Sequence, residues 1–156
     1  TVNKTFDIGE LPLASKEKTI SQHDICMEHV SFSYTGKENV IHDVSIKIPE
    51  NSFYALVGPS GGGKSTLARL VARFWDTTEG NISIGGVNIK DIPLTQLADE
   101  VSFVTQDNFL FNSSIMENIR LGNPKATDTE VLEAARKAQC DEFINKTGTW
   151  VSIYRW

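Results

Sequence analysis

The stretch GPSGGGKS at residues 58–65 decides how the rest of the chain is interpreted. It satisfies the pattern G-x-x-x-x-G-K-[S/T], in which glycines let successive backbone N–H groups turn toward one point without side-chain clashes. A concave row of amides that opens into the positive end of a helix attracts anions. The pattern therefore predicts a phosphate-binding loop, in which Lys64 places its charge on phosphate oxygens, Ser65 helps to coordinate Mg²⁺ and Thr66 adds a further hydroxyl.

The residues on either side of the loop supply the setting that this mechanism requires. The run Phe53–Val57 is dense in apolar residues, which is typical of a strand buried on both faces. After the loop, apolar residues recur with the spacing of an amphipathic helix, at Leu67, Leu70, Val71, Phe74 and Trp75. Because a buried strand leads through the loop into a helix, the motif is not read as a chance match.

Alternating apolar patterns surround this central unit. Residues 25–34 and 44–48 alternate with period two and are separated by a turn at Gly36–Asn39, so they predict two strands. Residues 81–89 read as a hairpin around the glycine turn Gly85–Gly86. These segments predict antiparallel strands attached to an α/β core.

The second half of the chain adds further elements. A short helix is expected from Pro93, and Val101–Thr105 is expected as a short strand that ends at Gln106–Asn108. Two capping-box patterns, Ser114–Glu117 and Thr127–Glu130, predict the starts of two helices.

Composition limits the function classes. The 156 residues carry a formal net charge of −5, so no broad positive surface is available for nucleic acid. The two cysteines lie far apart, which fits neither a disulfide framework nor a zinc site. No stretch approaches the roughly 20 apolar residues of a membrane span. The chain as given is expected to be soluble, with residues 1–24 as a tether and the domain starting near Ile25.

Several stretches together narrow the interpretation to one family. They are Val30–Tyr34 (VSFSY), Val44–Pro49 (VSIKIP), Ala55–Thr66 (ALVGPSGGGKST), Val101–Gln106 (VSFVTQ) and Leu110–Ile119 (LFNSSIMENI). In order and spacing they resemble the ATP-binding domain of ABC exporters, over about residues 25 to 146. Gly62 stands where many members carry Ser, a small-for-small change that should not harm the loop.

The resemblance implies roles for individual residues. Tyr34 would stack on adenine and Val40 would pack beside the ring, although a tyrosine at a strand end is, taken alone, more often ordinary packing. Gln106 would reach Mg²⁺ or the attacking water. The segment Phe109–Phe111 would face a transmembrane domain or belong to the core, and both interpretations stay open.

The residues expected to bind nucleotide are Tyr34, Val40, Gly58, Pro59, Ser60, Gly61, Gly62, Gly63, Lys64, Ser65 and Thr66. Lys64 and Gln106 are the catalytic candidates, and Ser65 and Gln106 the metal ligands. The expected fold is a RecA-like P-loop NTPase core with an attached antiparallel β-subdomain, incomplete because the family's signature motif, catalytic glutamate and switch histidine do not occur. Residues 25–156 are thus expected to be a partial domain that binds MgATP with negligible hydrolysis on its own.

In the full-length protein the resemblance implies an ATPase that drives export at the cytoplasmic face of a membrane. Its partners would be a transmembrane domain and a second nucleotide-binding domain. A P-loop kinase or GTPase is less well supported: residues 145–148 (NKTG) resemble the guanine-reading N-K-x-D motif, but Gly148 offers no carboxylate. The pair Asp99–Glu100 precedes a strand and is expected as solvated charges at a helix end. A non-catalytic nucleotide-binding or interaction module remains an alternative.

Overall fold

A computed structural model describes residues 13–105, 109–140 and 144 of this chain. The chain divides into two compact units, Thr1–Val104 and Thr105–Trp156, which are described separately below.

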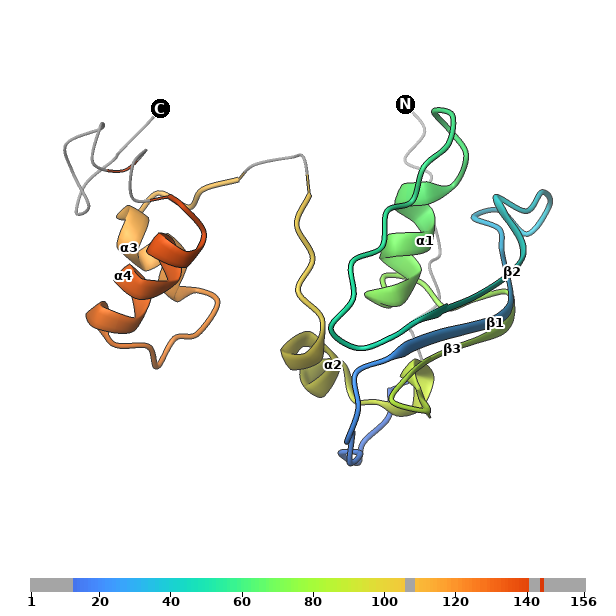
Figure 1. Cartoon of the computed structure of the whole chain (residues 1–156), viewed down its shortest axis with the longest axis horizontal. Coiled ribbons are helices and arrows are strands. Elements are labelled where there is room, and N and C mark those ends of the chain that lie inside the picture. Colours follow the sequence, from blue (N-terminus) through green and yellow to red (C-terminus); the bar gives the residue numbers. More distant parts are fainter. Residues whose placement is uncertain (1–12, 106–108, 141–143, 145–156) are drawn as a thin grey trace, which may run out of the picture. The chain divides into compact units, whose positions relative to one another are not determined.

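The first unit contains a four-stranded sheet with the strand order β2-β1-β3-β4 (Figure 1). Its strands are β1 (Ile25–Phe32), β2 (Ile41–Ile48), β3 (Glu79–Ile84) and β4 (Val87–Asn88). Every pairing is antiparallel, and Met27 in the centre of β1 lies opposite Ile46 on one side and Ile82 on the other. The two alternating patterns and the hairpin predicted from the sequence are therefore confirmed.

The geometry of the turn between β3 and β4 explains why two glycines predicted a hairpin there. Gly85 and Gly86 have φ angles of 55° and 77°. A two-residue hairpin turn that follows the natural twist of the strands needs positive φ at both central positions, which glycine adopts without steric cost.

Helix α1 (Lys64–Val71) lies over one face of the sheet (Figure 1). Leu67 and Leu70 on this helix belong to the same buried cluster as Val30, Phe32 and Ile82 of the strands. Burial of such side chains contributes about 1.5–3 kcal/mol each, so this cluster is the main source of stability in the unit.

Helix α1 is shorter than its apolar spacing predicted. The expected pattern continued to Trp75, but the helix ends at Val71 and Arg73 has a φ of 52°. The Arg73 side chain is almost completely buried, and its guanidinium donates hydrogen bonds to the carbonyl oxygens of Ile89 (3.2 Å) and Ile92 (3.3 Å). Phe74 and Trp75 therefore lie beyond the helix, because the chain turns to place Arg73 inside.

Arg73 reaches the short 3₁₀ helix η1 (Ile89–Asp91) and Ile92, which follows it. Helix α2 (Leu94–Glu100) comes next along the chain. Pro93 immediately precedes α2, as the sequence predicted. The pair Asp99–Glu100 lies at the end of α2, and Oε2 of Glu100 is 2.9 Å from Nε2 of His23.

Two predicted strands are not found. Phe53–Val57 and Val101–Thr105 are described without strand structure, and every residue of the first run is exposed. The reason is physical: a strand of the parallel, doubly buried type needs hydrogen-bonding neighbours and covering elements on both faces. Among the described residues neither run has a strand partner, so its β-forming side chains alone do not produce a strand.

The second unit contains helices α3 (Ile115–Arg120) and α4 (Asp128–Lys137). Both begin where the sequence predicted. Thr127 and Glu130 form the complete reciprocal capping box, whereas at α3 only the Ser114 hydroxyl accepts a bond from the Glu117 N–H. The backbone N–H of Thr127 and then its hydroxyl, both bonded to the Glu130 carboxylate, hold the pKa of that group below its usual value.

Candidate functional site

The glycine loop ends on the first turn of α1. The residue before the helix, Gly63, has a φ of 77° and offers no side chain to cap the helix, and no acidic residue lies in the first turn. The first backbone N–H groups of a helix have no partner within the helix, and its dipole makes this end positive. The first turn of α1 is therefore open to an anion from outside.

Gly63 is required at its position by close packing. A Cβ atom there would lie 2.6 Å from Cδ1 of Ile41 and 3.0 Å from the carbonyl oxygen of Val40. The first distance is shorter than real Cβ contacts and the second is tighter than most of them, and the positive φ adds strain to any other residue. Glycine at this position therefore lets the start of β2 lie close to the loop without strain.

The Lys64 ammonium group closes the loop from the helix side. Its Nζ donates hydrogen bonds to the carbonyl oxygens of Gly58 (3.0 Å) and Pro59 (2.7 Å). An ammonium group has three N–H donors, so these two bonds hold the charge at the loop and leave it a further donor for a ligand. The carbonyl oxygens of Gly58 and Pro59 thus hold the ammonium group of Lys64 in place.

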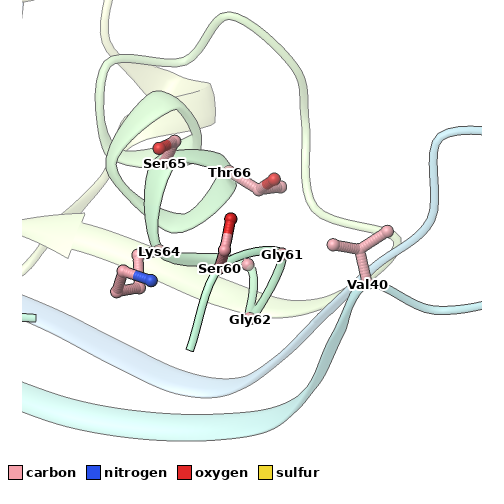
Figure 2. Close-up of a pocket in the computed structure, with 8 residues that line it drawn as sticks. Val40, Ser60, Gly61, Gly62, Lys64, Ser65 and Thr66 are labelled. Carbon is pink, nitrogen blue, oxygen red and sulfur yellow. The ribbon is translucent and has the colours of Figure 1, made fainter. Parts of the chain in front are cut away.

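A cavity of about 220 Å³ lies at this loop. Figure 2 shows its residues gathered around the first turn of α1, with Val40 reaching it from the segment before β2. The lining residues are Val40, Ser60, Gly61, Gly62, Gly63, Lys64, Ser65 and Thr66. They include one cation, three hydroxyl groups and no carboxylate, which is the composition expected of an anion-binding site.

Tyr34 joins this site through a single hydrogen bond. Its hydroxyl group and that of Thr66 are 2.9 Å apart. The Tyr34 ring is perpendicular to the rings of Phe32 and Trp75, with centroid distances of 4.8 and 5.0 Å. The Tyr34 side chain remains 46% exposed, so it has ring surface to offer a ligand.

The structure brings together the predicted site residues that it describes. Seven residues from Ser60 to Thr66 and Val40 line one cavity, Gly58 and Pro59 bind the Lys64 ammonium, and Tyr34 binds Thr66. Gln106 lies outside the described residues. The sequence did not indicate Phe32 and Trp75 as neighbours of Tyr34, because Trp75 was assigned to the apolar face of a helix that ends before it.

A metal ion at this site would need ligands from the nucleotide as well as from the protein. No group of three or more His, Cys, Asp or Glu side chains that could hold a metal occurs in the described part of the chain. The exposed Ser65 hydroxyl in the cavity fits a different arrangement, in which one protein oxygen and phosphate oxygens share Mg²⁺.

The apolar segment Phe109–Phe111 of the second unit is exposed. The side chains of these residues are mostly exposed within this unit, and the two phenylalanine rings meet at right angles with a centroid distance of 5.0 Å. Asn118 of α3 fixes the segment, because its amide accepts a bond from the Phe111 N–H (2.7 Å) and donates to the Phe111 carbonyl (3.1 Å). Of the two interpretations left open by the sequence, burial in the core of this unit is not observed.

Comparisons with known proteins agree on a single family. The family model for ABC transporters matches residues 41–152. An uncharacterized ABC transporter ATP-binding protein of Bacillus subtilis (strain 168) is 45% identical over 139 residues, which are 89% of this chain and 23% of that protein. A protein of Staphylococcus aureus (strain NCTC 8325 / PS 47), whose name includes the words "multidrug export ATP-binding/permease protein", is 47% identical over 92% of this chain and 25% of its own length.

A solved structure gives the same result for the fold. The structure of a bacterial Atm1-family ABC exporter with ATP bound matches with a TM-score of 0.80 and 35% identity, covering 92% of this chain and 25% of that chain. The chain thus spans about a quarter of the length of the relatives it matches. Within the described residues, no helix has the length and apolar character to cross a bilayer.

Proposed function

Because the chain belongs to the ABC transporter family, through residues that match its ATP-binding proteins, we propose that the loop Gly58–Thr66 binds the phosphates of ATP together with Mg²⁺. The observation that supports this most directly is the first turn of α1. It has no side-chain cap and no acidic residue, and the Lys64 ammonium lies beside it. Positive charge and free backbone donors at one helix end are what a triphosphate requires.

In this proposal each residue of the loop has a separate task. Lys64 neutralises the β and γ phosphates, and the backbone amides of the loop surround them. Ser65 contributes its hydroxyl to Mg²⁺, which supplies charge neutralisation between the phosphates when it is bound. Tyr34 stacks on adenine with Val40 beside it, and Gln106 approaches the metal or the attacking water.

In the full-length protein we propose the ATP-binding domain of an exporter, in which hydrolysis drives transport. The partners are a transmembrane domain and a second nucleotide-binding domain, and the location is the cytoplasmic face of a membrane. The names of two similar proteins, a multidrug export ATP-binding/permease protein and an ATP-bound ABC exporter, combine ATP binding with export and support this proposal. Residues 25–156 would contribute to the nucleotide-binding domain and residues 1–24 to a link that precedes it.

We also propose that Phe53–Val57 and Val101–Thr105 become core strands of a RecA-like sheet when neighbouring strands are present. Both runs have the apolar composition of doubly buried strands, and both end at residues assigned to the nucleotide site. By itself the 156-residue chain should bind ATP with negligible hydrolysis. Among the described residues that line the cavity, no carboxylate could act as a general base.

The test is equilibrium binding of a fluorescent ATP analogue, with and without Mg²⁺, to the wild type and to Lys64→Ala. Loss of a charge-assisted contact to phosphate should weaken binding at least about tenfold. Lys125→Ala is the matched control, because it removes the same charge from an exposed position outside the loop. Folded wild type without affinity at millimolar ATP, or equal affinities of the two variants, would contradict the proposal.

A further inference from the structure

The hydrogen bond between Tyr34 and Thr66 connects two parts of the site that lie 32 residues apart in the sequence. Tyr34 follows strand β1, whereas Thr66 is in the first turn of α1 and lines the cavity at the glycine loop. Thr66 is 8% exposed and Tyr34 is 46% exposed, so the bond is partly buried. A hydrogen bond between two side chains limits the orientations that both can adopt.

The rings around Tyr34 restrict it further. Phe32 is buried and Trp75 is partly buried, and both rings meet the tyrosine ring at nearly right angles, 85° and 89°. Perpendicular aromatic pairs at these centroid distances are attractive. Tyr34 is therefore held by two ring contacts and one hydrogen bond, while nearly half of its side chain remains accessible.

We propose that Thr66 is a positioning residue for base recognition, since its hydroxyl fixes the Tyr34 ring relative to the phosphate-binding turn of α1. This inference rests on the proposed binding of ATP. This arrangement favours a nucleoside triphosphate as the ligand, because the bonded pair of Tyr34 and Thr66 contacts both the base and the phosphates. A ring that is already oriented loses less conformational freedom when the base stacks on it.

The test is a double-mutant cycle with Tyr34→Phe and Thr66→Val. Tyr34→Phe keeps the ring and removes its hydroxyl, and Thr66→Val removes the partner at similar volume. Tyr34→Phe should weaken MgATP binding about fivefold in the wild type, because a ring that is no longer oriented must be immobilised when the base stacks on it, at a cost of about 1 kcal/mol. In the Thr66→Val background the same change should matter less than about twofold, because the bond is already lost. Thr66→Ser keeps a hydroxyl and should restore the full effect.

Magnesium tripolyphosphate serves as a ligand without a base. Its affinity should fall by a smaller factor than that of MgATP when Tyr34 is changed to Phe. Tyr54→Phe is the matched control: Tyr54 is exposed, its hydroxyl has no hydrogen bond within the described residues, and ATP affinity should not change. Circular dichroism checks that all variants are folded.

The outcomes separate this inference from the function on which it rests. Wild type that binds neither ligand contradicts both. Wild type that binds ATP, with a Tyr34→Phe effect of equal size in the wild-type and Thr66→Val backgrounds, contradicts only the positioning role. A parallel loss of ATP and tripolyphosphate binding would do the same, because Tyr34 would then act on the phosphates rather than on the base.

Discussion

Strand β1 and the run Phe53–Val57 each contain five apolar residues, but only β1 forms a strand. Strand β1 lies in the middle of the sheet, with antiparallel partners on both sides, and its side chains from Val30 to Phe32 are buried. Phe53–Val57 has no strand partner within the described residues, and all of its side chains are exposed. A composition rich in β-forming residues therefore favours a strand, but the strand forms only where another segment is placed to pair with it.

The largest expected effect contrasts the two phenylalanines of these segments. Phe32→Ala should lower the free energy of unfolding by about 3–5 kcal/mol, because it empties a buried aromatic site. Phe53→Ala should change it by less than about 0.5 kcal/mol, because the Phe53 ring is fully exposed. Urea unfolding followed by circular dichroism measures both. Comparable losses for the two variants would mean that Phe53 is packed and the contrast is wrong.

Two glycines test the contrast between the paired strands and the unpaired loop at the level of the backbone. Gly80 and Gly61 have similar φ angles, 74° and 80°. A Cβ at Gly80 would lie 2.2 Å from the His29 carbonyl oxygen in β1, whereas at Gly61 it would meet no atom within 4 Å. Gly61→Ala should therefore cost only the conformational strain, about 1–2 kcal/mol.

Gly80→Ala should cost about 1 kcal/mol more than Gly61→Ala, because β1 and β3 must also move apart. The same unfolding measurement compares the two variants directly. Equal costs would show that the β1–β3 pairing yields easily to an added methyl group, and that the sheet is looser than its register suggests.

Helix caps differ from strands in that the two residues of a cap lie only three positions apart, so their formation does not depend on distant segments. Thr127→Ala removes a cap that is reciprocated by Glu130, and should cost about 1 kcal/mol of helix stability. Ser114→Ala removes a cap with only one of its two bonds, and should cost less. The loss of helical circular dichroism signal on mild heating ranks the two variants, and a larger loss for Ser114→Ala would reverse the expectation.

The smallest expected effect is a dependence on pH. The pKa of Glu130 is lowered from 4.5 by its bonds to Thr127, so the folded state favours the charged carboxylate. Its contribution to stability is present above pH 4.5 and is lost as the pH falls through the lowered pKa. Glu130→Gln should remove this part of the acid sensitivity of α4, measured as helicity against pH. An unchanged acid profile in that variant would show that the capping carboxylate does not titrate in this range.

The sequence predicted best what depends on nearby residues. Four local features were predicted correctly, because each depends on partners a few positions away. They are the Gly85–Gly86 turn, the helix starts at Ser114 and Thr127, and the helix that follows the glycine loop. The strands predicted at Phe53–Val57 and Val101–Thr105 are not formed in this structure, because strand pairing requires distant segments that local composition does not specify.

The candidate site shows the same division. The loop residues from Ser60 to Thr66 share one cavity, as their motif indicated. The contacts of Tyr34 with Thr66 and Trp75 join three separate segments, and no spacing in the sequence signals them. The end of α1 was also missed, since the burial of Arg73 depends on carbonyl groups near residue 90.

That buried guanidinium has a mechanical consequence. Helix α1 is only about 12 Å long, at 1.5 Å per residue. Its first turn follows Gly63, which has no room for a side chain beside Val40 and Ile41, and two residues after its end Arg73 donates hydrogen bonds to the carbonyl oxygens of Ile89 and Ile92. Because a helix of about two turns has little length over which to bend, we expect a displacement at the glycine loop to reach residues 89–92 as a tilt of the whole helix.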